Sequence, residues 1–409
     1  MVEIHARGAR RRPVIGVVYV ARGALPRAGG IQEHLDRVAT SMGDRGYIVR
    51  VLAARIDDQP FTRLNTTLRV QKFPAFVHDR VTTEPFPLST RRRVRMLPVA
   101  LTAVPGIDRL GLYHRLREAT LSGVIAALSP GFAWAFMSAD VVHAMGGEAQ
   151  AHAALAVSRH NRLPFVITPF AHPGFWGDDE LNLRLYREAD AVVALLDGEA
   201  RWLEEKGVDR AKIHVIGVAA PEAPALISPI SVTKPLVLCL GVKRPYKYRL
   251  LLEAIKHVKR SDVRFAFVGP RTPDWDRDIS SIDDPRVLDI PKVDEREKWE
   301  WLAAADLLCL ASVSEIMPVT ILEAWRNGRP VVVARGRWTA DLVDDGQNGT
   351  IVPPQAEAVA EAIEALLADP ARAHSMGESG RLKVEAKYAA AAVSAAHERL
   401  YRSLEGAKG

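Results

Sequence analysis

An alternation of apolar, β-branched segments with amphipathic helical segments runs along the 409-residue chain and constrains its fold more than any other feature. Residues 14–21 predict a strand, residues 31–42 carry apolar side chains at helical spacing, and residues 47–54 predict a second strand. A strand–helix–strand unit of this kind joins parallel strands of one sheet. Because further units follow, the first half of the chain predicts a doubly wound α/β domain.

The alternation stops between residues 218 and 235, where four prolines occur without clear periodicity, as is typical of an interdomain linker. It starts again at residue 236, and from about residue 356 the pattern is helical to the end. Two doubly wound domains in tandem place a ligand cleft between the carboxyl ends of their sheets. We therefore predict Rossmann-like domains over residues 1–218 and 236–385, a linker over residues 219–235, and a C-terminal helix over residues 386–409 that returns to the N-terminal domain.

The composition is that of a globular protein, with 48% apolar and 25% charged residues. Its two cysteines, Cys239 and Cys309, each lie inside an apolar run, which predicts buried thiols in a reducing compartment. A disulfide framework and a cysteine-based zinc site are therefore excluded.

Basic residues are concentrated in the first hundred residues, which hold 18 lysines and arginines against 8 acidic residues, whereas the whole chain has a net charge of +6. Clusters occur at residues 10–12 and at Arg91, Arg92, Arg93 and Arg95. Such clusters form either a solvated basic face or a contact for an anionic membrane surface or acidic acceptor, and both readings stay open. Because the clusters lack interleaved aromatic residues, we expect no nucleic-acid partner.

Two apolar stretches share features with targeting segments. Residues 14–21 are too few and too β-branched for a signal peptide, so a first strand is expected. Residues 119–139 carry no charge, but Pro130 and Gly131 interrupt them and hydroxyl side chains are frequent, so we expect no transmembrane helix. The expected location is cytoplasmic, with peripheral contact at the inner membrane face as an open alternative.

Two acidic residues stand eight positions apart in the segment that follows the predicted strand at residues 306–311. Pro318 suits the first position of a helix, which places Glu315 in the loop before it and Glu323 about one and a half turns inside it. Both carboxylates can then face one cleft, where a carboxylate can accept hydrogen bonds from hydroxyl groups of a ribose or a sugar. In the alternative interpretation, Glu323 forms a surface pair with Arg326, and Glu315 is an ordinary loop residue.

The start of that helix and a basic segment after the strand at residues 236–240 both favour an anion. The free amides of Val319 and Thr320 and the positive end of the helix dipole point toward the cleft. Lysines and an arginine crowd residues 243–247, just before a helix that the apolar spacing predicts near residues 250–259. Cations are unfavourable at a helix N-terminus unless an anion lies nearby, although an ordinary basic helix start remains the alternative.

The segment from Ser314 to Trp325, with its lead-in from Ala311 and its continuation to residue 353, resembles the acidic signature of the retaining nucleotide-sugar glycosyltransferases of glycosyltransferase family 4. The resemblance extends over nearly the whole chain. It implies the GT-B fold, in which an N-terminal acceptor-binding domain and a C-terminal donor-binding domain face each other across a cleft. It also implies transfer of a sugar from a nucleotide-diphosphate donor to an acceptor hydroxyl with retention, in polysaccharide or glycoconjugate biosynthesis.

The resemblance carries roles for individual residues. Gly241 and Lys247 keep the family's spacing for holding the donor diphosphate, but Val242 stands where the family has an arginine, so Lys243 or Arg244 has to supply the second charge. His172 resembles the family's histidine that contacts the donor sugar. The implied catalytic residues are Lys247, Glu315 and His172, and the implied donor site comprises Gly29, Gly30, Gly241, Lys243, Arg244, Lys247, Glu315, Met317, Pro318, Val319, Thr320 and Glu323.

The resemblance implies a carbohydrate or lipid-linked acceptor as partner, with no cofactor and no metal ion. Asp274 and Asp276 have the spacing of metal-binding carboxylates in a different glycosyltransferase fold, but they lie in a predicted loop where short acidic runs are common. Two rival functions stay open: a sugar-nucleotide epimerase of the same fold and a non-catalytic nucleotide-sugar-binding protein.

Overall fold

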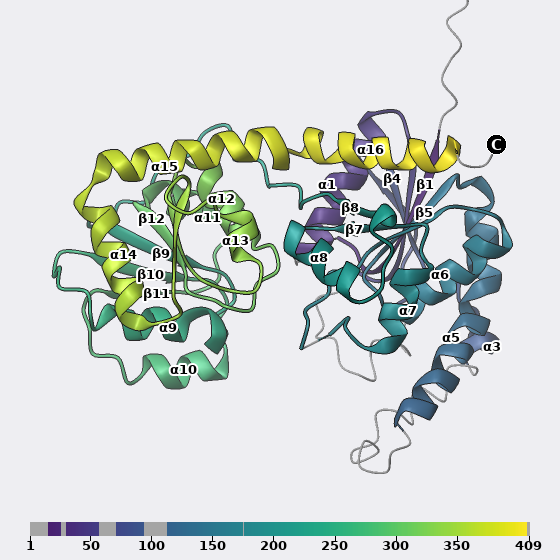
Figure 1. Cartoon of the computed structure of the whole chain (residues 1–409), viewed down its shortest axis with the longest axis horizontal. Helices are drawn as coiled ribbons and strands as arrows, with labels where there is room; N and C mark the ends of the chain where they lie inside the picture. Colours follow the sequence, from purple (N-terminus) through teal and green to yellow (C-terminus); the bar gives the residue numbers. More distant parts are fainter. Residues whose placement is uncertain (1–14, 26–29, 57–70, 94–112, 175, 407–409) are drawn as a thin grey trace, which may run out of the picture. The chain divides into compact units, whose positions relative to one another are not determined.

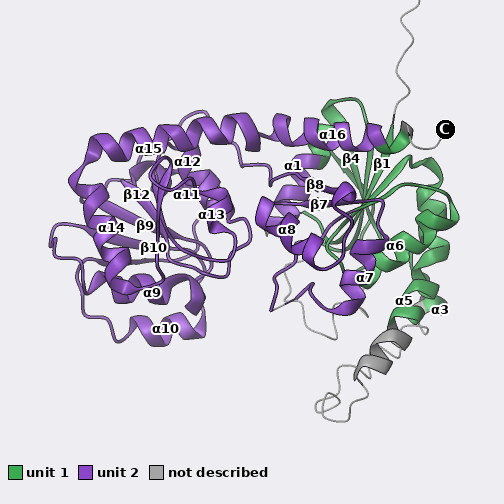
Figure 2. Cartoon of the chain, viewed as in Figure 1, with its two compact units in different colours: residues 1–28, 39–166, 404–409 green, residues 29–38, 167–403 purple. Residues whose placement is uncertain are grey.

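Parallel strands separated by helices make up both halves of the chain (Figure 1). The computed structural model describes residues 15–25, 30–56, 71–93, 113–174 and 176–406. The chain divides into two compact units: unit 1 comprises residues 1–28, 39–166 and 404–409, and unit 2 comprises residues 29–38 and 167–403 (Figure 2). The domain boundaries that the sequence analysis places at residues 218, 235 and 385 remain predictions.

Unit 1 contains both strands of the first predicted strand–helix–strand motif. Its strands lie in the order β3-β4-β2-β1-β5, and all neighbours are parallel except β3 and β4, which are antiparallel. The strands are β1 (Gly16–Gly23), β2 (Ile48–Arg55), β3 (Phe76–His78), β4 (Val81–Pro85) and β5 (Val141–Met145). Among the described residues before residue 161, the helices are α1 (Gly30–Asp44), α3 (Thr90–Arg93), α5 (Tyr113–Ala135), a 3-10 turn (Phe136–Ser138) and α6 (Ala149–His160).

Helix α5 covers most of the uncharged stretch at residues 119–139 and contains Pro130. Among the described residues, one helical segment, Leu121–Ser138, has the length and composition to cross a membrane, and 44% of it is buried in the protein. Core helices of soluble proteins pass the same test.

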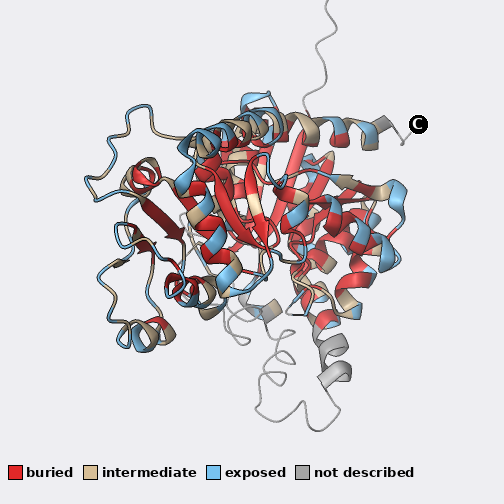
Figure 3. Cartoon of the chain, turned by 60° about the vertical axis from the view of Figure 1, so that its left-hand side comes forward, coloured by how far each residue is buried: buried red, intermediate tan, exposed pale blue. Residues whose placement is uncertain are grey.

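Unit 2 contains a parallel sheet of six strands in the order β11-β10-β9-β12-β13-β14. These strands are β9 (Leu236–Leu240), β10 (Arg264–Val268), β11 (Val287–Ile290), β12 (Leu307–Leu310), β13 (Val331–Ala334) and β14 (Gly349–Val352). Every residue of β9, β12 and β13 is buried. Successive side chains of a strand point to opposite faces, so both faces of this sheet are covered, as expected for a parallel sheet (Figure 3).

The remaining elements of the first half follow the predicted alternation. The strands β6 (Phe165–Thr168), β7 (Ala191–Ala194) and β8 (Ile213–Val215) are neighbours in that order. They are interleaved with α7 (Glu180–Glu188), α8 (Asp197–Glu205) and a 3-10 turn (Arg210–Lys212). The predicted α/β class is confirmed, with parallel strands in both halves of the chain and one antiparallel pair, β3 and β4.

The helices of the second half are α9 (Pro245–Ile255), α10 (Pro273–Ile279), α11 (Glu295–Ala304), α12 (Val319–Arg326), α13 (Thr339–Leu342), α14 (Ala356–Ala368), α15 (Pro370–Lys383) and α16 (Ala390–Gly406), with a π-helical turn at Val384–Tyr388. Helix α9 begins five residues before the predicted Leu250, because Pro245 is suited to the first turn of a helix. Pro318 caps α12, which begins one residue after the predicted start. Asp274 and Asp276 lie in α10 and not in a loop, because the Thr272 hydroxyl caps this helix by accepting from the Trp275 amide.

The C-terminal helices return to the N-terminal half of the sequence. In unit 2, the rings of His397 on α16 and His34 on α1 are 6.4 Å apart, and both side chains are buried. The Ala220 amide donates to the Tyr388 carbonyl over 2.7 Å. These contacts bear out the predicted return of the last helix.

Candidate functional site

The loops after β9 and β12 meet because these strands are parallel neighbours, with Val237 beside Leu307. The carboxyl ends of parallel neighbours lie at the same edge of the sheet. There the Nζ atom of Lys247 lies 2.8 Å from Oε1 of Glu315, and the two side chains are 22% and 13% exposed. The structure thus brings together two of the three predicted catalytic residues.

Gly241 opens the first of these loops with a φ angle of +126°, a backbone conformation that residues other than glycine rarely adopt. A Cβ built on it would meet no atom within 4 Å, so the backbone faces open space. The neighbouring Gly269 is constrained instead by packing, since a Cβ there would come 2.1 Å from the Gly241 carbonyl oxygen. Gly241 therefore leaves room for a ligand to approach the backbone.

The structure distinguishes the two candidates for the second cation. Lys243 is 3% exposed, and its ammonium group donates to Asp289 and to the Ile290 carbonyl over 2.6 Å. Burial lowers the pKa of Lys243, and the hydrogen bond to Asp289 opposes that shift. Arg244 is exposed at the N-cap of α9. The Lys243 ammonium is thus committed inside the protein, and Arg244 is the candidate with an exposed side chain.

Helix α12 begins beside Glu315. No side chain caps its first turn, where Val319 and Thr320 follow Pro318. The first amides of a helix have no partner within it, so this end is suited to an anion. Met317 lies before the helix, 7% exposed, and its Sδ atom accepts from the Val218 amide over 3.2 Å.

Glu323 is held inside the protein and not on the surface. It is 3% exposed, and its Oε1 atom lies 2.7 Å from Nζ of Lys298 on α11. Burial raises the pKa of Glu323, while the charge of Lys298 opposes the shift. Arg326 pairs instead with Glu222 over 2.8 Å. The surface-pair alternative for Glu323 is therefore wrong, and the sequence analysis missed Lys298 because nothing local marks it as a partner.

His172 follows β6, where it forms an isolated bridge with Trp176, and the two rings are 3.7 Å apart. Its Nδ1 atom lies 3.3 Å from the Phe170 carbonyl oxygen. Burial lowers the pKa of His172, so the ring is neutral at pH 7. His172 and Glu315 line one pocket of about 140 Å³ in unit 2. The other residues lining this pocket are Pro173, Val313, Ser314, Ile316, Arg337 and Trp338.

Arg337 and Trp338 were missed by the sequence analysis, because they lie in the loop after β13, a strand that is distant from His172 in the sequence. The predicted Gly29 lies outside the described residues. Gly30 is the first residue of α1 and is exposed, and a Cβ placed on it would meet no atom within 4 Å.

Glu199 is a buried carboxyl group near this pocket that the sequence analysis also missed. It lies in α8, is fully buried, and accepts from the Leu195 amide over 2.6 Å. Burial raises its pKa from 4.5 to about 7, whereas hydrogen bonding from the backbone of Leu195 and Ala171 opposes the shift. Ala171 directly precedes His172, so Glu199 connects α8 to the segment that carries the histidine.

The raised pKa of Glu199 predicts a pH-dependent stability. A carboxyl group that binds its proton more tightly when folded stabilises the fold below its unfolded pKa of 4.5, and this contribution is lost as pH rises through about 7. Between pH 5 and pH 8, ionisation of Glu199 should lower the free energy of unfolding by about 2 to 3 kcal/mol, and Glu199→Gln should abolish this decrease. Urea titrations at both pH values measure it. The exposed Glu204→Gln on the same helix is the control, and equal slopes in Glu199→Gln and the wild type would refute the assignment.

The carboxylates considered for a metal ion are engaged in ion pairs. Asp274 pairs with Arg277, and Asp276 pairs with Arg271 over 2.6 Å. Among the residues that the structure describes, no group of three or more histidine, cysteine, aspartate or glutamate side chains is arranged to hold a metal ion.

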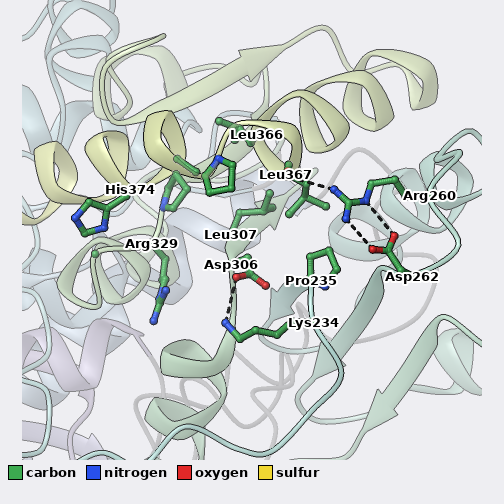
Figure 4. A pocket seen from close by; sticks show the side chains of 14 residues that line it. Lys234, Pro235, Arg260, Asp262, Asp306, Leu307, Arg329, Leu366, Leu367 and His374 are labelled. Atoms are coloured by element: carbon green, nitrogen blue, oxygen red, sulfur yellow. Dashed lines mark hydrogen bonds and ion pairs between the residues drawn. The ribbon is translucent and has the colours of Figure 1, made fainter.

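A larger pocket, of about 450 Å³, lies at the opposite end of the strands, where β9, β12 and β13 begin (Figure 4). Four of its charged side chains form two ion pairs: Lys234 lies 3.1 Å from Asp306, and Arg260 lies 2.7 Å from Asp262. Arg329 donates to the Ala303 carbonyl over 2.7 Å. None of the predicted site residues lines it. The smaller pocket beside Lys247 is therefore the candidate site.

Two family models match the chain. The model for the glycosyl transferase 4-like domain matches residues 29–219, and the model for glycosyl transferases group 1 matches residues 234–369. Together they span most of the chain. Among curated proteins, the lipopolysaccharide core biosynthesis glycosyltransferase LpsE of Rhizobium meliloti is 26% identical over 238 residues, covering 56% of this chain and 68% of LpsE.

Solved structures of similar fold cover nearly the whole chain. Sucrose-phosphate synthase from Thermosynechococcus elongatus aligns with a TM-score of 0.70 and 19% identity, covering 96% of this chain and all of that one. HepE of Anabaena in complex with UDP-glucose aligns with a TM-score of 0.66 and 16% identity, covering 94% and 99%. These likenesses establish a GT-B fold. With both family models matched in order, the chain belongs to the GT4-type glycosyltransferases.

Proposed function

We propose that this glycosyltransferase moves a sugar from a nucleotide-diphosphate donor to an acceptor hydroxyl and retains the anomeric configuration. The observation that carries the proposal is the meeting of Lys247 and Glu315 at the adjoining ends of β9 and β12. The open backbone of Gly241 and the uncapped start of α12 belong to the same two loops. A cation, free amides and an accessible backbone together suit a diphosphate.

In this proposal Lys247 changes partner when the donor binds. The diphosphate replaces the Glu315 carboxylate beside the lysine ammonium, and Glu315 is released to accept a hydrogen bond from a hydroxyl of the donor sugar. Arg244 and the amides of Val319 and Thr320 share the phosphate charge. Because these groups are fixed before the reaction, they stabilise the charge that develops on the leaving diphosphate.

The transfer breaks the bond between the anomeric carbon and the diphosphate oxygen and forms a bond from that carbon to the acceptor oxygen. The acceptor proton passes to the departing diphosphate on the same face of the sugar, so the configuration is retained and the nucleoside diphosphate leaves. The neutral His172 lies in the pocket beside Glu315, where its ring can contact the donor sugar. Glu323 is proposed to accept hydrogen bonds from the donor ribose.

The relatives support this class of substrates. HepE of Anabaena was solved with UDP-glucose, and LpsE acts in lipopolysaccharide core biosynthesis. We propose by analogy that the chain uses a nucleotide sugar in the synthesis of a polysaccharide or glycoconjugate.

Proton NMR of the running reaction tests the function. The first product should show the coupling constant of the donor's own anomer, and the nucleoside diphosphate should appear only when an acceptor is present. An inverted product would overturn retention. Conversion of the donor into an isomer without an acceptor would instead favour the epimerase.

The proposed charge stabilisation needs no metal ion, because side-chain cations and helix amides take its place. Activity is therefore expected to persist in excess EDTA, measured as nucleoside diphosphate released per minute. Complete loss that Mn²⁺ or Mg²⁺ restores would contradict this, and it would direct attention back to Asp274 and Asp276.

The basic N-terminal region is proposed to bring the enzyme to anionic bilayers. In unit 1, α3 contacts α5, Arg91 of α3 is exposed, and Trp134 and Met137 near the end of α5 are 67% and 80% exposed. Arg95 lies outside the described residues. Cations near a bilayer contribute about 1 kcal/mol each at low salt, and exposed apolar side chains add to the contact.

Sedimentation with phosphatidylserine vesicles tests this contact. We expect salt-sensitive binding that weakens when Arg91, Arg92, Arg93 and Arg95 are changed to glutamine, with phosphatidylcholine vesicles as the control. Failure of the wild type to sediment with anionic vesicles at low salt would favour a soluble acceptor. It would also indicate that the arginines form an ordinary solvated face.

A further inference from the structure

Within the described residues, Arg337 is a cation of the His172 pocket that has no partner in the protein. It is exposed in the loop between β13 and α13 and lines the pocket together with His172 and Glu315. No ion pair or hydrogen bond joins its side chain to another residue of the described chain. By contrast, many other arginines of unit 2 pair with a carboxylate, as Arg201 does with Asp341 over 2.6 Å.

The charges of the pocket do not cancel. The Glu315 carboxylate is balanced by the Lys247 ammonium 2.8 Å away, and burial keeps His172 neutral at pH 7. Arg337 therefore leaves an excess positive charge at the pocket wall. Ile316 and Trp338, which are 6% and 4% exposed, form an apolar part of this wall. Beside apolar groups, a cation attracts an anion more strongly than it does in open solvent.

The loop that carries Arg337 is held in place by its neighbours. The Gly336 amide donates to the Thr339 hydroxyl oxygen over 2.7 Å. Trp338 is buried beside Trp202, with ring centres 6.2 Å apart. It also packs against Gly198, where a Cβ would come 2.4 Å from Cδ1 of the tryptophan. Fixing the loop before a ligand arrives lowers the entropy that binding costs.

We infer that Arg337 determines specificity for a substrate that carries an oxyanion, a carboxylate or a phosphate, on the group that enters this pocket. The guanidinium is planar and can donate two parallel hydrogen bonds to such a group. A volume of about 140 Å³ corresponds to four or five water molecules, so the pocket takes a charged substituent with part of its sugar ring and not a nucleotide. The inference rests on the proposed function.

The oxyanion has two sources, which matched pairs of substrates separate. The donor arm compares UDP-glucuronic acid with UDP-glucose, and GDP-mannuronic acid with GDP-mannose, by calorimetric titration of the full chain. The acceptor arm compares glucose 6-phosphate with glucose, by nucleoside diphosphate release. Each arm uses the wild type, Arg337→Gln and Arg337→Lys. The control is Arg335→Gln, an exposed arginine two residues away that does not line the pocket.

In the arm that carries the anion, we expect Arg337→Gln to weaken binding of the acidic member of a pair by roughly 10- to 100-fold and to change binding of the neutral member by less than about twofold. The loss should appear in Kd or KM and not in kcat, and Arg337→Lys should recover part of it. If Arg337→Gln causes this selective loss in the donor arm, the anion belongs to an acidic donor sugar. If the loss occurs in the acceptor arm, the anion belongs to a phosphorylated acceptor.

The inference is overturned if Arg337→Gln changes acidic and neutral members equally, if Arg335→Gln has the same selective effect, or if the wild type uses only the neutral members. These outcomes leave the proposed function intact, because nucleotide sugars still bind and turn over. If the wild type binds no nucleotide sugar of either kind, the proposed function fails and the inference fails with it.

Discussion

Replacing Lys247 with alanine is expected to lower kcat by roughly 10²- to 10³-fold, the loss typical of one preorganised group that stabilises a developing charge. The Lys247 ammonium lies in the first turn of α9, directly after the loop with the open backbone of Gly241, and 2.8 Å from Glu315. Steady-state rates of nucleoside diphosphate release measure the change. The fold should survive, since the side chain is 22% exposed and not part of the core.

The matched control is Lys256→Ala, which removes an exposed lysine from the other end of the same helix. This variant should keep the wild-type kcat and the wild-type unfolding midpoint. Wild-type turnover by Lys247→Ala would show that the diphosphate is held elsewhere. A fall in the unfolding midpoint that accounts for the lost activity would likewise remove the support that this variant gives to the charge-stabilising role.

The second large effect is expected in stability. Lys298→Ala leaves the Glu323 carboxylate, 3% exposed, without its partner 2.7 Å away. Breaking a buried ion pair in this way costs on the order of 3 kcal/mol, because the remaining charge stays desolvated. The pKa of Glu323 is already raised by burial, so losing the lysine raises it further and the destabilisation grows as pH increases. Urea denaturation at pH 6 and pH 8 measures both effects.

Two companion variants separate the buried pair from a general effect of the mutation. Glu295→Gln removes only the exposed partner of Lys298 and should cost less than about 1 kcal/mol. Adding Glu323→Gln to Lys298→Ala removes the unpaired charge and should restore part of the stability. Lys298→Ala with wild-type stability would contradict the assignment of this pair.

The fold was predictable because its signals are local. The strands at residues 236–240 and 306–311 are continuous apolar runs, which is the pattern of strands covered on both faces. Pro318 marked one helix start to within a residue, since α12 begins at Val319. The apolar spacing placed the start of α9 near Leu250, five residues too late, because Pro245 opens this helix. The family resemblance placed Lys247 and Glu315 in one donor site, but their contact was not predicted; it arises because the adjacent parallel strands β9 and β12 bring their carboxyl ends together.

The rest of the site depends on tertiary neighbours that no local pattern contains. Glu199 looks like an exposed acid in the first turn of a helix until the backbone around His172 buries it. Lys243 looked available for the diphosphate, but Asp289, 46 residues later, engages its ammonium group. Arg337 came into view only because its loop lies beside a histidine that precedes it by 165 residues in the sequence.

Nucleoside diphosphate release, assayed over a panel of UDP-, GDP- and ADP-sugars with and without a pool of carbohydrate acceptors, tests the central claim most directly. The account predicts that at least one donor is consumed by the wild type, that consumption requires an acceptor, and that Lys247→Ala reduces it at least 100-fold. A donor consumed equally fast by the wild type and by Lys247→Ala, or isomerised with no acceptor and no diphosphate release, would contradict it.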